Sequence, residues 1–366
     1  MGHEVFTTDR YVAAREKFEV TEDVHVTRRA EERAQETGRL SPLVDPSYNP
    51  MRYSKIRKNP HGTRWYATVG CPMDIEVSCD TTGSMGGEVD TEMRILPQLY
   101  EAIAKVLPGY DPQLCLGNFQ DVCDGYPLCR PQFEMQADKI VEYLKEMVPC
   151  RAGGDAAEDS QYAMLARAYL TNAYTNLIGL KGYHFIITDA SCHVRFKADE
   201  IREIFGENIL ENELQNLNVK SLTMEKVIKD LKSKTHQFVL VVGYHESATD
   251  FWRDYCGDNS VIEIPSTLYL PEIISAIIGL TEGTMDITDL KQHLGRAYSN
   301  TLIEQLSSID IGAQAKLRAK MPHPVPKKGD IFLDKEDIWP IQDGDDVAEE
   351  PHPEESATES GTITYL

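Results

Sequence analysis

The sequence has no run of about 18 or more consecutive apolar residues, the length that a helix needs to cross a bilayer. Its N-terminus, MGHEVFTTDRYVAAREKFEV, lacks the basic-then-apolar order of a secretory signal peptide. Phe6 also stands where an N-myristoylation signal has serine or threonine. These absences predict a chain without a membrane-spanning helix, and we expect a cytoplasmic location.

Cysteine is too irregularly spaced to indicate a zinc site or a disulfide framework. The chain has eight cysteines, and no two of them form a Cys-x-x-Cys pair. Without a secretion signal they are expected to stay reduced. Cys79 and Cys115 fall inside apolar segments, so we interpret them as small residues of the core.

Cationic side chains are scarce as well. The chain has 37 Lys and Arg against 59 Asp and Glu, a net charge of −22. This balance argues against nonspecific binding to nucleic acid or to an anionic membrane, and we expect neither as a partner. The excess of acids is concentrated in residues 334–366, which carry 11 acids and one lysine. Such a segment is typical of a solvated, disordered tail.

What the sequence does have is a regular alternation of strand-like and helix-like segments. Near-continuous apolar strands are expected at residues 73–80, 112–121, 182–190, 236–244 and 260–264. Helices are expected at residues 88–107, with Pro97 kinking the first, and at 137–147, 157–170 and 270–280. This alternation predicts an α/β fold: a Rossmann-like, doubly wound, mainly parallel sheet with helices on both faces.

The predicted domain organisation has four parts. Residues 1–72 are a polar N-terminal extension that docks on the main unit, with a helical piece at VTRRAEERAQETGRL. Residues 73–283 form the α/β domain, and residues 284–320 add one helical segment with a capping-type start at Thr288 and Asp289. Residues 321–366 comprise a proline-containing linker and the acidic tail.

A group of oxygen-bearing side chains follows the first strand of the α/β domain. The stretch DIEVSCDTTGSMGGEVD leaves the strand at an acid and continues through hydroxyl residues, with Gly83 permitting a tight turn. Two later acids join this group. Asp155 comes just before an expected helix, and Asp189 comes at the end of the most apolar strand. The carboxyl ends of parallel strands meet at one edge of a sheet, and hard divalent cations prefer oxygen ligands. The five candidate metal ligands are Asp80, Thr82, Ser84, Asp155 and Asp189.

The order of these residues resembles the metal-ion-dependent adhesion site (MIDAS) of the von Willebrand factor A (VWA) fold. That motif is Asp-x-Ser/Thr-x-Ser, then Thr or Asp in a later loop, then Asp at the end of a central strand. Here the pieces are DTTGS at residues 80–84, Asp155 in GGDAAED, and Asp189 in IITDA. The resemblance covers residues 72–283. It departs from the best-known adhesion members at Asp155, where those members have threonine.

The resemblance implies a bound Mg²⁺ (or Mn²⁺ or Ca²⁺) and a function in protein binding, as an adaptor or scaffold. A partner's acidic side chain would complete the metal shell, although a third carboxylate at Asp155 makes the metal less electrophilic and weakens this mode. The sequence looks like the intracellular microbial and phage members, which often pair with MoxR-type AAA+ ATPases. Such an ATPase is therefore one expected partner.

Other residues near the expected metal edge are candidates for a partner-binding rim. The rim residues are Met85, Gly86, Gly87, Asp121 and His193. Glu158 and Asp159 are interpreted as acids in the first turn of a helix, where the helix dipole favours negative charge. His184 and Trp252 are expected to be core residues.

Two alternatives to a binding role remain open. The metal could act as a structural staple in a larger assembly, with the extensions making the contacts. A metal-dependent hydrolase is less favoured: aspartyl-phosphate enzymes have a second acid two residues after the nucleophile, and Thr82 occupies that position. A phosphate-binding GxxxxGK[ST] loop is absent too. We therefore expect no enzymatic activity. The acidic tail could also compete for the metal in cis.

Overall fold

The structure is a computed structural model, and it describes Ala13 and residues 28–41, 43–44, 56–58, 65–67, 71–134, 137–149, 157–177, 179–320 and 331–333. Asp155, the linker at residues 321–330 and the acidic tail from residue 334 onward lie outside these ranges. No helix among the described residues is long and apolar enough to span a membrane.

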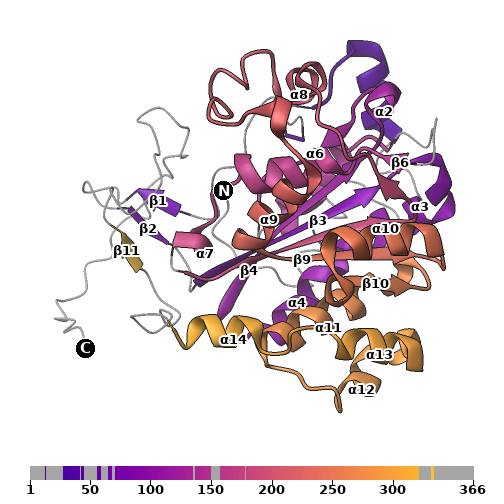
Figure 1. Ribbon diagram of the computed structural model, residues 1–366, viewed down its shortest axis with the longest axis vertical. Coiled ribbons are helices and arrows are strands. Elements are labelled where there is room, and N and C mark those ends of the chain that lie inside the picture. Colours follow the sequence, from indigo (N-terminus) through magenta and orange to yellow (C-terminus); the bar gives the residue numbers. More distant parts are fainter. Residues whose placement is uncertain are drawn as a thin grey trace.

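A six-stranded sheet forms the centre of the molecule (Figure 1). Its strand order is β10-β9-β7-β3-β4-β5, and every neighbouring pair is parallel except β4 and β5. The expected α/β class and mainly parallel sheet are thus confirmed. The strands are β3 (Cys71–Asp80), β4 (Tyr110–Phe119), β5 (Leu128–Cys129), β7 (Gly182–Thr188), β9 (Thr235–Val242) and β10 (Val261–Ile264).

Strand β3 is the point at which the connections change direction. The chain runs from β3 to β4 on one side, and the next strand of this sheet after β5 is β7, on the other side of β3. In open α/β sheets a binding crevice forms at such a switch point, beyond the carboxyl ends of the strands. The end of β3 is Asp80 and the residue after β7 is Asp189, so both acids lie at the carboxyl ends of the strands beside this switch point.

Helices cover both faces of the sheet (Figure 1). One apolar core contains buried side chains of α3 (Gly87–Ile95), α4 (Leu99–Val106), α5 (Ala137–Glu146), α11 (Leu270–Glu282), α12 (Leu290–Leu294) and α13 (Asn300–Ser307). The other contains α6 (Gln161–Leu165) with its π-helical continuation Ala166–Leu170, α8 (Ala198–Phe205), α9 (Met224–Lys234) and α10 (Glu246–Cys256). Trp252 is fully buried in this second core.

Several shorter elements complete the described structure. Helix α2 (Arg28–Thr37) docks on α5 and buries Ala30 and Ala34, and α7 (Tyr174–Leu177) packs near β3. Helix α14 (Ala313–Arg318) packs against α11. Strands β1 (Ile56–Lys58), β2 (Trp65–Ala67) and β11 (Ile331–Leu333) form a small antiparallel sheet. Strands β6 (Ala157–Glu158) and β8 (Ser191–Cys192) form a two-residue parallel pair.

Two helical expectations need correction. The segment after Gly283 is not one helix. Helix α12 ends at Leu294, before Gly295 with its positive φ of 52°, and α13 starts separately with Ser299 as its N-cap. The helix expected at residues 157–170 starts later, at Gln161, because Ala157 and Glu158 pair with β8. The break at Pro97 is as expected: a 3₁₀ turn, Leu96–Gln98, separates α3 from α4.

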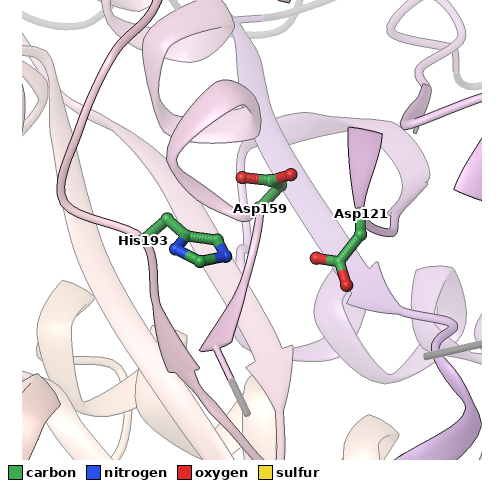
Figure 2. A group of neighbouring side chains, drawn as sticks. All are labelled: Asp121, Asp159 and His193. Carbon is green, nitrogen blue, oxygen red and sulfur yellow. The ribbon is translucent and has the colours of Figure 1, made fainter. Parts of the chain in front are cut away.

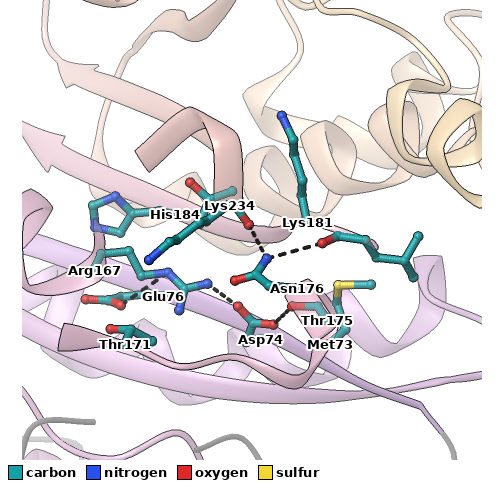
Figure 3. A network of polar contacts seen from close by, with 12 residues as sticks. Met73, Asp74, Glu76, Arg167, Thr171, Thr175, Asn176, Lys181, His184 and Lys234 are labelled. Carbon is teal, nitrogen blue, oxygen red and sulfur yellow. Dashed lines mark hydrogen bonds and ion pairs between the residues drawn. The ribbon is translucent and has the colours of Figure 1, made fainter. Parts of the chain in front are cut away.

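Alternate residues of β3 carry charge, and a buried ion network compensates it (Figure 3). Arg130 donates two hydrogen bonds of 2.7 Å to the Glu76 carboxylate, and Arg167 pairs with Asp74. All four side chains are at most 4% exposed. His184 lies beside them, hydrogen-bonded to Ser78 and Gln237, and burial lowers its pKa to about 4. The His184 imidazole is therefore neutral at pH 7, as expected for a core histidine.

Candidate metal centre

Asp80 is the innermost acid of the site. Its side chain is fully buried, and both carboxylate oxygens accept hydrogen bonds. Oδ1 accepts from the Thr82 backbone N–H at 2.9 Å and from Thr82 Oγ1 at 2.6 Å, while Oδ2 accepts from Thr188 Oγ1 at 2.6 Å. Three donors from the ends of β3 and β7 thus hold the Asp80 carboxylate in one orientation.

Ser84 and Asp189 lie on the same side of the strand ends as Asp80. Ser84 Oγ donates to Asp189 Oδ1 at 2.9 Å, and Ser84 Oγ lies 3.3 Å from Thr82 Oγ1. Four of the five predicted ligands are therefore brought together by one turn and one strand end. The fifth, Asp155, lies outside the described residues.

The turn that carries Thr82 and Ser84 depends on a glycine other than the expected one. The residues Gly83–Met85 form a single 3₁₀ turn, and Gly83 does not have a positive φ. Gly86 has φ 50° and ψ −122°, which disfavours any residue with a β-carbon. This conformation at Gly86 lets α3 start at Gly87, immediately after the oxygen-bearing turn.

Glu158 is a site residue that the sequence analysis did not identify. It is 2% exposed, and its carboxyl lies against Thr82 and Asp121. Among the described residues, Glu158 Oε2 has no hydrogen-bond partner. The acid belongs to β6 rather than to the first turn of a helix, so pairing with β8 directs its carboxyl toward the end of β3. The one available signal was its position three residues after Asp155 in GGDAAED.

The electrostatics of the site favour a bound cation. Burial raises the pKa of Asp80 to about 6, against the hydrogen bonds from Thr188 and Thr82, and the neighbouring Asp189 raises it further. Burial and the charges of Asp80 and Asp121 raise the pKa of Glu158 to about 9. Within the described part of the chain, no Lys, Arg or His forms an ion pair with Asp80, Asp189 or Glu158. Carboxylates and hydroxyls that converge without a cationic side chain fit a hard divalent cation.

The predicted rim residues fall into three groups. Asp121 and His193 lie next to the site and share a cluster with Asp159, in which one ligand atom from each residue lies within 4.8 Å of the others (Figure 2). Gly86 and Gly87 are exposed at the turn. Met85 is a correction: it is 3% exposed and packs into the core beneath the turn, because it closes the 3₁₀ turn on its buried side. Its side chain is therefore not exposed at the rim.

Comparisons with known proteins add only distant structural similarity. No family model and no curated protein matches the chain. Solved structures that resemble it include proximal thread matrix protein 1 from the mussel byssus with a zinc-occupied MIDAS motif, at 12% identity and a TM-score of 0.39, and a second crystal form of that protein, at 11% and 0.38. Both alignments cover 58% of this chain and 46% of that one. The pilus adhesin SpaC from Lactobacillus rhamnosus GG matches at 12% identity and a TM-score of 0.37, over 66% of this chain and 34% of SpaC.

This chain therefore spans less than half the length of each of these proteins. At such identities and TM-scores the similarity does not identify ligands or partners.

Proposed function

We propose that the chain is a VWA-type module that binds a protein partner through a divalent cation, with Mg²⁺ as the expected ion. Asp80, Thr82, Ser84 and Asp189 would hold the cation, and Glu158 adds a fifth oxygen-bearing side chain. The observation that carries this proposal is the convergence of carboxylates and hydroxyls around the buried Asp80, with no cationic side chain paired to them in the described residues. A bound Mg²⁺ would present a coordination position to an oxygen atom of a partner.

The surroundings of the site support a partner with apolar side chains next to its acid. Among the described residues, three of the large hydrophobic side chains that are exposed follow strands that end at this edge. Tyr244 comes after β9 and is 72% exposed, Val194 comes after β8 and is 40% exposed, and Leu268 comes after β10 and is 42% exposed. Exposed aromatic and aliphatic groups beside a polar centre are typical of a protein-binding surface.

The same geometry favours binding over catalysis. Thr82 stands where an aspartyl-phosphate enzyme has its second acid, and threonine is a weak general acid. Four described core cysteines are not activated nucleophiles, because burial raises the pKa of Cys79, Cys115, Cys192 and Cys256. We therefore propose no enzymatic activity. The MoxR-type ATPase partner rests on resemblance alone and stays a prediction.

Selection of displayed random peptides on the immobilised full chain tests the binding role. We expect Mg²⁺ to enrich peptides with Asp or Glu beside an apolar residue, and chelator to release them. With a selected peptide, Tyr244→Ser should weaken binding about tenfold, since exposed aromatics dominate such interfaces. Tyr298→Ser is the matched control: Tyr298 is 37% exposed but lies between α12 and α13 and does not follow a strand, so its loss should leave the affinity unchanged.

Peptides that bind equally well in chelator, or that bind an Asp189→Ala variant as tightly as the wild type, would contradict the proposed role. If the chelator lowers the thermal midpoint without releasing peptides, the metal is a structural staple instead.

A further inference from the structure

Three loops at the same edge of the sheet bring a histidine and two aspartates together (Figure 2). Asp121 follows β4, Asp159 follows β6 and His193 follows β8. One carboxylate oxygen of each aspartate and one imidazole nitrogen lie within 4.8 Å of one another. Asp121 and Asp159 are 3% and 9% exposed, and His193 is half-buried. Figure 2 shows the His193 ring and the two carboxylates facing a common space.

Hydrogen bonds outside the cluster hold its members in place. Asp159 Oδ2 accepts from the Val122 backbone N–H at 2.9 Å, and Asp159 Oδ1 accepts from Gln161 Nε2 at 2.6 Å. The His193 backbone N–H donates to the Glu158 carbonyl oxygen at 3.1 Å, which extends the pairing of β6 with β8. A backbone hydrogen bond therefore joins the His193 loop to β6, and the Asp159 carboxylate joins the loop after β4 to the same place, so the side chains start from a defined arrangement.

A second observation indicates that a positive ligand belongs here. Glu158 is 2% exposed, its carboxyl lies against that of Asp121, and its Oε2 has no hydrogen-bond partner among the described residues. Two carboxyl groups side by side in a buried position repel each other unless a proton or a cation lies near them. The Glu158 side chain thus places a further carboxyl group at the border between the Asp80 site and the cluster of Asp121, Asp159 and His193.

We propose that Asp121, Asp159 and His193 bind a second divalent cation, one of the ions that accept imidazole nitrogen, with Zn²⁺ as the preferred species and Mn²⁺ next. The donor set is what separates the two sites. Asp80, Thr82, Ser84, Asp189 and Glu158 offer only oxygen, which suits Mg²⁺. The second cluster adds an imidazole nitrogen, and Zn²⁺ accepts both imidazole nitrogen and carboxylate oxygen. This second site does not depend on the proposed partner binding, and either site can exist without the other.

Titration of Zn²⁺ into the chelator-treated full chain, in a large excess of Mg²⁺, tests the second site. The excess Mg²⁺ occupies the all-oxygen site and leaves the histidine-containing site available for Zn²⁺. We expect one Zn²⁺ per wild-type chain. His193→Ala and Asp159→Asn should weaken Zn²⁺ binding by more than about 100-fold, because even the loss of a group that only orients a ligand costs about 10- to 100-fold. Zn²⁺ should also raise the thermal midpoint of the wild type and not that of His193→Ala.

Three control variants make the result decisive. His245→Ala removes an exposed histidine after β9 and should leave Zn²⁺ binding unchanged. Asp189→Ala disrupts the proposed Mg²⁺ site and should keep Zn²⁺ binding. This variant therefore distinguishes loss of the Mg²⁺ site from loss of the Zn²⁺ site. Cys123→Ser tests the alternative group of Asp121, Cys123 and Asp124, which lies nearby. Unchanged Zn²⁺ binding in folded His193→Ala, or its loss in Cys123→Ser or in Asp189→Ala, would overturn the proposal.

Discussion

Asp80→Asn is expected to abolish stabilisation by Mg²⁺ and, at the same time, to make the metal-free chain more stable. The Asp80 carboxylate is buried, and without a cation its pKa rises from 3.8 to about 6. At pH 7.5 the metal-free protein therefore holds a buried negative charge that the unfolded chain would expose to water. The difference between the two pKa values corresponds to a loss of at most about 3 kcal/mol in the free energy of unfolding of the metal-free chain. An uncharged asparagine avoids this loss.

The pH dependence has a defined sign. Between pH 3.8 and about 6 the folded metal-free chain binds the Asp80 proton more tightly than the unfolded chain does. The Asp80 contribution to the free energy of unfolding therefore falls as the pH rises through this window, and it stays constant above pH 6. The Asp80→Asn variant should lack this fall, so the difference between variant and wild type should be small near pH 4 and largest above pH 6.

Urea unfolding in chelator and in Mg²⁺, at pH 4.5 and pH 7.5, measures both effects. Asp250→Asn is the control: Asp250 is exposed on α10, and its substitution should change neither the pH dependence nor the response to Mg²⁺. An Asp80→Asn variant that Mg²⁺ still stabilises as much as the wild type would show that the cation binds elsewhere.

Arg130→Met should destabilise the fold by about 3–5 kcal/mol, the range for removing one partner of a buried ion pair. Arg130 donates two hydrogen bonds to Glu76, and the Glu76 side chain is fully buried. Those two bonds and the charges of Arg130 and Arg167 lower the pKa of Glu76 against the effect of burial. Methionine fills much of the space and leaves Glu76 with only the more distant Arg167 Nε, 3.7 Å away. Urea denaturation of both proteins measures the loss.

Two further variants show whether the loss comes from the unpaired charge. Lys226→Met breaks an exposed pair with Asp230 on α9 and should cost less than about 1 kcal/mol. Glu76→Met combined with Arg130→Met removes both charges and should recover part of the stability, since apolar replacements of a whole pair are often tolerated. If Arg130→Met cost no more than Lys226→Met, the buried network would not contribute to stability as described.

The sequence predicted the parts of the fold that depend on local patterns. The apolar runs that became β7 and β9 are long and rich in β-branched residues, so their strand character did not depend on distant contacts. Placing Asp80 and Asp189 together required only that β3 and β7 be neighbours, and they are. The proximity of the four described candidate ligands followed from two strand ends and the turn after β3.

The missed acids and the missed ion network depend on long-range pairing. Glu158 reaches the site because a two-residue strand pairs with β8, and so short a strand has no periodicity to detect. The polar face of β3 was interpreted as part of an apolar strand, because the arginines that compensate Asp74 and Glu76 lie 93 and 54 residues away in the chain. Asp159 was assigned to a helix for the same reason as Glu158, so its proximity to His193 was not foreseen.

Calorimetric titration of Mg²⁺ into the chelator-treated full chain, beside an Asp189→Ala variant, tests the metal site most directly. Asp189 is half-buried and accepts a hydrogen bond from Ser84, so the variant is expected to fold, which circular dichroism would verify. The wild type should bind one Mg²⁺, and Asp189→Ala should bind it more than about 100-fold more weakly. If the wild type binds no Mg²⁺, or Asp189→Ala binds it equally well, the oxygen cluster at the end of β3 is not a metal site.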